Sequence, residues 1–495
     1  MVARRYAQKG HATLPASMPA SWSGAGSRAR HLFWPAIGLL AAAVAAALWL
    51  TGPGGPLPES QTQATPDREP PAKGAGRLPS LIESALARTL PAAQRPSLAD
   101  HAGLQAVSLM DNEFEQVVPL LGSAEARLID IYQHIGRGDH RPALAMAEEL
   151  VRDHPNFQLA QLVLGDLLSL QTRPVRRLGD VPDTKAEAAA EQLRALREES
   201  LRRMRALTER PPEGSIPSQF LVLGTQSRHA IAIDASRSRL YLFENQGAND
   251  GQSTPRMRLL GDFYISVGLS GTEKQVEGDK RTPLGVYYIT SSLNPRKLPD
   301  LYGVGALPIN YPNALDLQRG KTGSGIWLHG TPREQFVRAP QASDGCVVLS
   351  NPDLERLLET VQIRTTPVVI APELDWVTAD RADAERRRFQ AALDGWREAR
   401  GQADAERLRQ YYSPRFQAQG RDPEAWWSRT EDEMRMRGAR AVDLKDLSIL
   451  RWKDSDDTMV VTFGEVPQGQ ARGVTRRQYW ILEDKHWKIF YEGNV

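Results

Sequence analysis

The residue with the most chemical potential is Cys346, the one cysteine among 495 residues. A thiol becomes a strong nucleophile when it loses its proton, and an ordinary thiol needs a base for this at neutral pH. A lone cysteine cannot form a disulfide within the chain. A free thiol often serves only as a small buried hydrophobe. In an exported protein, however, a free thiol risks oxidation, which favours a chemical role.

His329 is the expected base. Only two histidines, His229 and His329, lie between Ser218 and Asp375. His329 follows a short apolar run, precedes Gly330 and stands seventeen residues before the cysteine. A histidine at a strand end is often structural, but this pairing favours catalysis. Gly345 permits a tight turn before the thiol and brings backbone N–H groups near the sulfur, where they can stabilise an oxyanion.

The pattern His329-Gly330, a loop and Ser343-Asp344-Gly345-Cys346 resembles the L,D-transpeptidase (YkuD-type) catalytic domain of bacterial cell-wall enzymes. The upstream run 277–287, EGDKRTPLGVY, is similar to a second motif of that family. The resemblance covers about residues 219–373, and the short predicted strands with Gly and Pro between them indicate a mainly β domain over 218–375. Within the second motif, Gly278, Thr282 and Gly285 are interpreted as structural residues.

The resemblance implies a cysteine acyltransferase that acts on peptidoglycan stem tetrapeptides. Cys346 would attack the carbonyl of the L-centre of diaminopimelate, D-alanine would leave, and a thioester would remain. His329 would take the thiol proton, with the Gly330 carbonyl orienting the imidazole. The N–H groups of Gly345 and Cys346 would form the oxyanion hole. An amine acceptor gives L,D-transpeptidation, whereas water gives L,D-carboxypeptidase or endopeptidase activity. A non-catalytic peptidoglycan-binding scaffold is the alternative from another class.

Two positions depart from the family pattern. Asp344 stands where many members have a second histidine, and Val348 where many have an arginine. The missing arginine removes a planar donor for a substrate carboxylate. Ser343, Asp344 and Arg338 are expected beside the substrate. The cations that could replace the arginine are Arg333, Arg338, Lys321 and Lys297.

Composition excludes several other functions. Lys and Arg total 62 against 60 for Asp and Glu, a net charge of +2, which gives no support to nucleic-acid binding. The nine histidines show no metal-ligand spacing, and one cysteine cannot build a cysteine-rich metal site. We therefore expect no metal and no cofactor.

The N-terminus predicts a single-pass membrane protein. Residues 1–31 contain five basic and no acidic residues, and residues 32–50 carry no charge. A helix of that length is about 28 Å long and could span a bilayer. The basic residues predict a cytoplasmic tail at 1–31, so in a bacterium the anchor at 32–50 would lie in the inner membrane and the catalytic part in the periplasm. A cleaved signal peptide and a buried core helix are the alternatives.

The remaining segments predict a multidomain α+β protein. Residues 51–80, rich in Pro and Gly, are a linker. Residues 81–210 predict helices, with about one and a half tetratricopeptide-like units, and form either a protein-docking platform or a spacer. Within them, 186–207 is interpreted as a solvated connector helix.

The last segment, 381–495, predicts two helices (381–400 and 403–412) and then four antiparallel strands. It resembles the nuclear-transport-factor-like (SnoaL-like) α+β cone. Its aromatic rings either fill a core or line a groove for wall peptide or glycan. Those expected on the helices are Phe389, Trp396, Tyr411, Tyr412 and Phe416.

Overall fold

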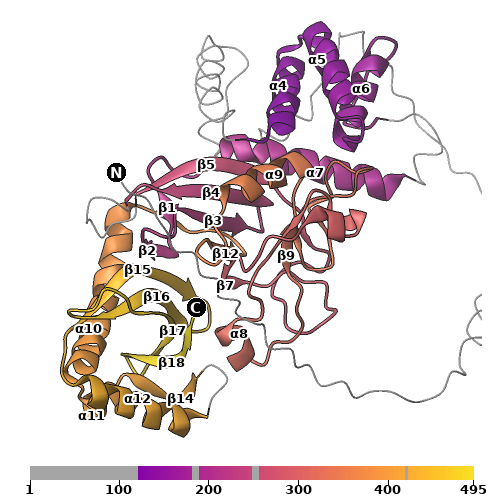
Figure 1. Ribbon diagram of the computed structural model, residues 1–495. Coiled ribbons are helices and arrows are strands. Elements are labelled where there is room, and N and C mark those ends of the chain that lie inside the picture. The colour runs from indigo at the N-terminus through magenta and orange to yellow at the C-terminus, as the bar shows by residue number, and fades with distance from the viewer. Residues whose placement is uncertain (1–120, 181–188, 248–255, 419–421) are drawn as a thin grey trace, which may run out of the picture. The chain divides into compact units, whose positions relative to one another are not determined.

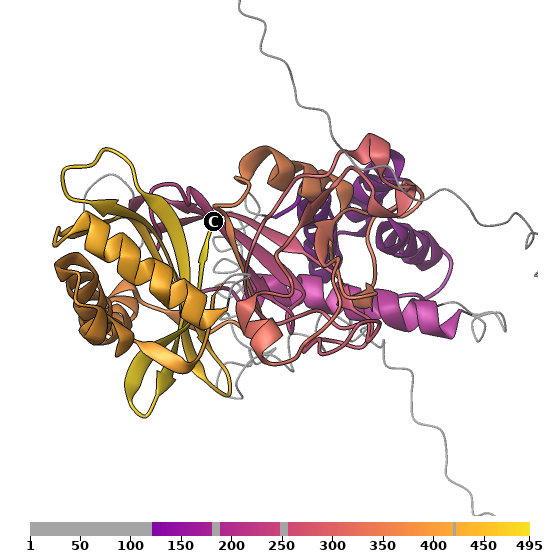
Figure 2. The same ribbon diagram turned by 60° about the horizontal axis from the view of Figure 1, so that its bottom comes forward.

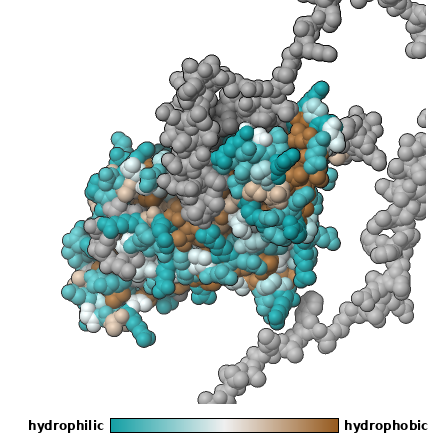
Figure 3. All heavy atoms as spheres, turned by 90° about the horizontal axis from the view of Figure 1, so that it is seen from above, coloured by the Kyte–Doolittle hydropathy of each residue, from teal (hydrophilic) through white to brown (hydrophobic). Residues whose placement is uncertain are grey.

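The computed structural model describes residues 121–180, 189–247, 256–418 and 422–495. The expected tail, anchor and linker, and the start of the helical segment, lie outside these residues. The chain divides into two units, 1–75 and 76–495, and all described residues belong to the second. No helix among the described residues is long and apolar enough to cross a membrane. Hydrophilic residues cover most of the described part of the face in Figure 3, between smaller apolar patches.

From residue 121 on, the described part of the helical segment contains three helices that stand side by side (Figure 1). They are α4 (Ser123–Arg137), α5 (His140–Asp153) and α6 (Gln158–Leu170). The apolar stripe of α4 packs against that of α5 and α6 in one buried cluster. α4 ends where Gly138 adopts a φ of 82°, a left-handed conformation that glycine adopts without steric cost.

A fourth helix, α7 (Ala190–Thr208), corrects the sequence interpretation of a solvated connector. Two of its charged residues, Glu199 and Arg203, are only 2% exposed. The cost of burying these charges is offset because Arg203 forms ion pairs with Glu199 and with Glu125 of α4, both at 2.9 Å. Its guanidinium also lies 4.0 Å from the ring centre of Tyr264. The helix is therefore part of the packed structure.

The centre of the catalytic domain is a five-stranded sheet with the order β5-β4-β3-β12-β7. β12 pairs parallel with β3 and antiparallel with β7. Residues of alternating position along β3 and β4 enter two different cores, so both faces of the sheet are covered. The strands are β3 (His229–Asp234), β4 (Arg239–Asn245), β5 (Met257–Tyr264), β7 (Gly285–Tyr288) and β12 (Pro367–Ala371).

Shorter elements form the rest of this domain. A three-stranded sheet has the order β11-β9-β8, and β10 pairs parallel with β6. β1 pairs with β13. The elements are β1 (Ile216–Pro217), β6 (Val267–Gly268), β8 (Ala306–Pro308), α8 (Ala314–Gln318), β9 (Trp327–His329), β10 (Gln341–Ser343), β11 (Val347–Val348), α9 (Asn351–Thr360) and β13 (Trp376–Val377).

The C-terminal cone consists of a curved sheet with helices α10 and α12, drawn in orange in Figure 2, on one face. Its sheet order is β14-β18-β17-β16-β15-β2, so the four predicted strands are joined by two others. The elements are β2 (Phe220–Val222), α10 (Ala379–Gln402), α11 (Ala405–Arg409), β14 (Tyr412–Ala418), α12 (Pro423–Arg437), β15 (Val442–Lys453), β16 (Asp457–Pro467), β17 (Val474–Glu483) and β18 (His486–Asn494).

Two expectations for the cone were wrong. Tyr412 and Phe416 lie on strand β14, which pairs parallel with β18, and not on a helix. Helix α12 was missed, although its start at Asp422-Pro423 has the cap and proline that open many helices. Phe389, Trp396, Tyr412 and Phe416 are all buried in one apolar cluster, which favours the core interpretation of these rings over the groove.

Candidate active site

Parallel pairing of β9 and β11 brings the predicted nucleophile and base to one place. Val347 pairs with Leu328, and Val348 pairs with His329. By this register, Cys346 stands beside Trp327. Because residues two apart in a strand point to the same face, Cys346 and His329 lie on one face of this small sheet. The sixteen residues between them, 330–345, are thereby closed into a connection between two adjacent strands.

His329 is 3% exposed and is oriented by its neighbour. Its Nδ1 lies 2.7 Å from the Gly330 carbonyl oxygen, so Nδ1 carries a proton and donates it to that oxygen. This leaves Nε2 as a proton acceptor. Burial lowers the pKa of His329 to about 4; the Gly330 carbonyl opposes this shift, and the charge of Arg338 adds to it. The imidazole is therefore neutral at neutral pH.

Cys346 is half-buried, and its Sγ donates to the Gly325 carbonyl oxygen at 3.5 Å. In the described structure the thiol thus contacts this carbonyl and not the imidazole. Burial raises the pKa of the thiol; a hydrogen bond from the Trp327 backbone and the charges of Arg338 and Lys274 counteract part of that rise, and Asp344 adds to it. The resting pair is a neutral thiol and a neutral imidazole.

The turn before the thiol corrects the roles expected for Ser343 and Gly345. The Gly345 N–H donates to Ser343 Oγ at 3.1 Å, so it is not directed at a substrate oxyanion. Ser343 is 3% exposed, and its hydroxyl donates to the Cys346 carbonyl oxygen at 2.6 Å. Both residues brace the turn. Glycine is required there because φ is 122° and a Cβ would lie 2.7 Å from the Arg281 carbonyl oxygen.

Of the four cations considered for the missing arginine, Arg338 is the one whose charge reaches both Cys346 and His329. It is half-buried, and its Nη1 donates to the Ala342 carbonyl oxygen at 3.4 Å. Lys321 is buried against Asp316 at 2.9 Å, and the side chain of Arg333 is 92% exposed beside Asp300. Lys297 is exposed.

Asp344, in the position of a second histidine, points outward. Its side chain is 89% exposed, and one carboxylate oxygen lies 3.9 Å from Lys280 Nζ. Its charge raises the pKa of the Cys346 thiol. Asp344 therefore affects the thiol only through its charge.

The second motif supports the floor of the site, as expected for its structural residues. Thr282 is fully buried; its Oγ1 accepts from the Gly268 N–H at 2.8 Å and donates to the Gly345 carbonyl oxygen at 3.0 Å. Asp279 has a pKa of about 2: burial opposes ionisation, but hydrogen bonds from Lys274 and from backbone N–H groups outweigh it. Lys274, which the sequence analysis missed, joins this floor to the thiol electrostatically.

Asn351 is a second residue that sequence reasoning missed. Its Oδ1 accepts from the N–H groups of Thr331 (3.1 Å) and Val304 (3.3 Å), and its Nδ2 donates to the Thr331 carbonyl oxygen at 2.9 Å. A Cβ on Gly330 would lie 2.1 Å from this Oδ1. Asn351 therefore fixes the backbone that presents the Gly330 carbonyl to His329. The sequence showed only that it follows Ser350, a typical helix cap.

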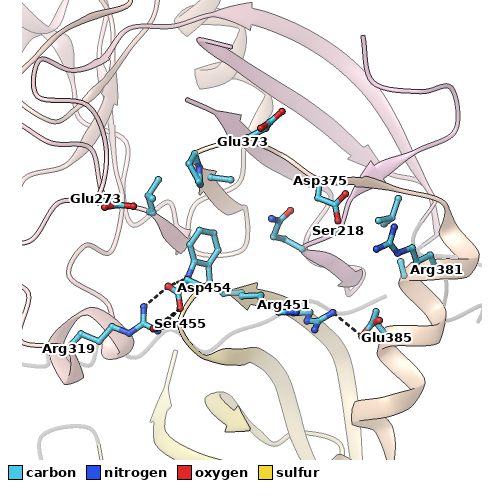
Figure 4. Close-up of a pocket in the computed structure, with 18 of the residues that line it drawn as sticks. Ser218, Glu273, Arg319, Glu373, Asp375, Arg381, Glu385, Arg451, Asp454 and Ser455 are labelled. Carbon is cyan, nitrogen blue, oxygen red and sulfur yellow. Dashed lines mark hydrogen bonds and ion pairs between the residues drawn. The ribbon is translucent and has the colours of Figure 1, made fainter. Parts of the chain in front are cut away.

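A separate cavity of about 820 Å³ lies between catalytic-domain residues and cone residues. In Figure 4, Arg319 points toward Asp454, and Arg451 points toward Glu385. The corresponding N–O distances are 2.6 Å and 2.9 Å. Neither Cys346 nor His329 lines this cavity. It is distinct from the candidate active site.

Comparison with known proteins assigns both domains. A model of the L,D-transpeptidase (YkuD) catalytic domain matches residues 228–370, which include His329 and Cys346. The chain contains an L,D-transpeptidase catalytic domain. A model of the Cds6 C-terminal NTF2-like domain matches residues 388–493. The two family resemblances seen in the sequence are thus confirmed.

This chain is similar to several solved structures, and it covers two of them over nearly their whole length. Bd1075 of Bdellovibrio bacteriovorus is 24% identical, with a TM-score of 0.48, over 57% of this chain and 98% of that one. The helical cell shape determining protein Pgp2 of Campylobacter jejuni is 24% identical, with a TM-score of 0.44, over 56% and 95%. No curated protein matches the chain.

Proposed function

We propose that this L,D-transpeptidase domain is an active cysteine acyltransferase that cleaves the diaminopimelate–D-alanine bond of peptidoglycan stem tetrapeptides. The observation that carries the proposal is the β9–β11 pairing, which puts Cys346 and His329 on one face of adjacent strands. A scaffold without catalysis would not need a base whose Nε2 is kept free by a hydrogen bond from Nδ1 to Gly330.

In the proposed acylation, Cys346 rotates from the Gly325 carbonyl toward His329 as the substrate carbonyl enters. His329 Nε2 accepts the thiol proton while sulfur attacks the carbonyl carbon. The C–N bond to D-alanine then breaks, and the proton passes from the imidazolium to the departing amine. Burial and Arg338 both disfavour a charged imidazole, which promotes this second transfer. The Cys346 N–H is the remaining expected donor for the oxyanion.

Deacylation reverses these roles. An acceptor attacks the thioester, His329 takes its proton, and the proton returns to sulfur. With an amine as acceptor a new amide bond forms, whereas with water the product is a tripeptide. Val348 is fully buried beside His329, so no planar donor occupies that position. Arg338 is then the group proposed to hold a substrate carboxylate.

We further propose that residues 32–50 anchor the chain in a bacterial inner membrane, with the catalytic part in the periplasm, where stem peptides are accessible. The uncharged run and the basic residues before it support this. Protease treatment of spheroplasts should degrade the catalytic domain if it is periplasmic. Protection of the domain until the membrane is lysed would contradict this location.

The decisive experiment uses tetrapeptide muropeptides and mass spectrometry with the detergent-solubilised full chain. Cross-linked dimers would indicate transpeptidation, and tripeptide monomers would indicate hydrolysis. Cys346→Ala should lower the rate by about a thousandfold or more, and His329→Gln by about a hundredfold or more. Unchanged muropeptides with the folded wild-type protein would remove the catalytic proposal and favour the wall-binding scaffold.

A further inference from the structure

The loop of residues 330–340, here called the Arg338 loop, connects the base to the strand that leads to the nucleophile. It starts directly after His329 and carries Arg338, whose charge acts on both Cys346 and His329. Within the loop, Thr331 Oγ1 donates to the Phe336 carbonyl oxygen at 3.1 Å. The position of this loop therefore determines the Arg338 contribution to the electrostatic environment of the thiol and the imidazole.

The helical segment holds this loop through the turn between α5 and α6, residues 154–157. Asn156 makes two hydrogen bonds to it. Its carbonyl oxygen accepts from the Phe336 N–H at 3.2 Å. Its Nδ2 donates to the Arg333 carbonyl oxygen at 2.9 Å. One residue of the helical segment thus pins both ends of the stretch 333–336.

Aromatic packing reinforces these bonds. The Phe336 ring stacks on Phe157 with centroids 4.3 Å apart, and it lies 5.0 Å from the His154 ring. Phe336 is 7% exposed and belongs to the same apolar cluster as α4, α5 and α6. On the other side of the loop, Tyr264 Oη donates to the Arg338 carbonyl oxygen at 3.2 Å. The loop is therefore built into the core of the helical segment.

We propose that the α5–α6 turn is a positioning part of the active site, which holds the Arg338 loop so that the Arg338 guanidinium keeps its place against the Ala342 carbonyl, on the strand that leads to Cys346. The helical segment then contributes to catalysis without touching substrate. This inference rests on the proposed roles of Cys346 and His329, and it replaces the spacer interpretation of the segment.

The charges that act on the thiol define what a displaced loop would do. Arg338 and Lys274 lower the pKa of Cys346, Asp344 raises it, and the neutral His329 lies on the adjacent strand. If the loop moves away, the thiol loses the Arg338 contribution, whereas Lys274 and Asp344 stand on other segments. The thiol pKa should then rise and its reactivity at a given pH should fall.

The test measures alkylation of Cys346 by iodoacetamide in the full chain from roughly pH 6 to 10. Because Cys346 is the only cysteine, the label reports on it alone. Asn156→Ala removes the side-chain bond to Arg333, and Phe336→Leu removes the aromatic stack but keeps an apolar side chain. Each should raise the alkylation midpoint by about half a pH unit, so that alkylation near pH 8 slows about threefold.

Two further variants show whether the effect runs through Arg338. Arg338→Gln should give a similar shift, and adding Asn156→Ala to it should shift the midpoint little further. Leu168→Ala, on the exposed face of α6, should leave the midpoint unchanged. Suppose instead that Asn156→Ala shifts the midpoint as much in the Arg338→Gln background as it does in the wild type. That result would overturn the route through Arg338.

Circular dichroism checks that each variant is folded. If Phe336→Leu does not fold, Asn156→Ala alone tests the proposal. A lowered melting temperature with an unchanged alkylation midpoint would overturn the inference, because it would show a merely structural role. Alkylation does not need a peptidoglycan substrate. A shifted midpoint in a protein that leaves muropeptides unchanged would therefore support the positioning role while the proposed function fails.

Discussion

The catalytic domain contacts its two neighbours through junctions whose buried parts differ in chemistry. Toward the cone, β2 pairs with β15 of the cone's sheet, and an apolar cluster includes Phe220 and Tyr241 together with Leu450 and Tyr479. The junction with the helical segment, here called the ionic junction, adds buried ion pairs to the apolar packing of Phe336 on Phe157. Arg239 binds Glu125 and Asp262 at 2.8 Å and 2.5 Å, with all three side chains nearly inaccessible to water.

The difference indicates separate tasks. An apolar core with a shared sheet responds little to pH or salt, and it leaves the thiol site untouched. Buried ion pairs depend on complete partners, because a charge left alone in the interior is costly. The ionic junction is also the one that continues, through Phe157 and Phe336, to the Arg338 loop. The cone junction thus supports the fold, whereas the helical junction is connected to the loop that carries Arg338.

The largest expected effect comes from breaking the ionic junction. Arg239→Ala removes the buried cation that Glu125 and Asp262 share, although Glu125 keeps its pair with Arg203, and it should lower the free energy of unfolding by about 3–5 kcal/mol. Urea unfolding measures this loss. Arg258→Ala is the control, because its pair with Glu244 is more exposed and should contribute at most about 1 kcal/mol. Equal losses in the two variants would contradict the importance of the buried network.

The cone junction should respond to a cavity in a different way. Leu450 is fully buried, so Leu450→Ala should cost about 3 kcal/mol. The loss should be the same at low and high salt, and the alkylation midpoint of Cys346 should not move. Leu482→Ala, at a 41% exposed position of β17, is the matched control and should cost much less. A moved midpoint in Leu450→Ala would show that the cone also acts on the thiol.

The pH dependence of catalysis should distinguish the junctions next. His329 accepts a proton only when neutral, so kcat/KM should fall as the pH drops through about 4, the pKa that burial gives this histidine. Leu450→Ala should not change the pH at which kcat/KM falls. Asn156→Ala should move this fall in kcat/KM toward higher pH, because displacing Arg338 removes one cause of the low pKa of His329. An acid limb at the ordinary histidine value in the folded wild type would contradict the neutral-base mechanism.

The smallest effect is expected at the edge of the cavity in Figure 4. Arg319 pairs with Asp454 and Asp456 across the cone junction, with side chains 22%, 34% and 44% exposed. Arg319→Ala should therefore cost only about 0.5–1 kcal/mol. Since salt screens exposed charges, the difference in melting temperature should shrink as salt is added. A large loss that persists in high salt would place part of the cone junction's stability in these ion pairs.

The sequence predicted the catalytic domain correctly where its motifs consist of residues close together in the chain. The unique cysteine, the histidine before glycine and the second motif marked the catalytic domain. Helix α7 was misinterpreted because its many charges look solvated in sequence. Its burial depends on Glu125 and Tyr264, which are distant in the chain.

The sequence by itself determined which atoms can do chemistry here, because the residue types that act as nucleophile and base are few and their motifs are local. Only the tertiary structure decided how they are held. It directed the Gly345 N–H to Ser343, selected Arg338 among four cations, and placed Asn351 and Asn156 around the loop. Contacts such as Arg239 with Glu125, 114 residues apart, arise from chain packing and leave no local pattern to read.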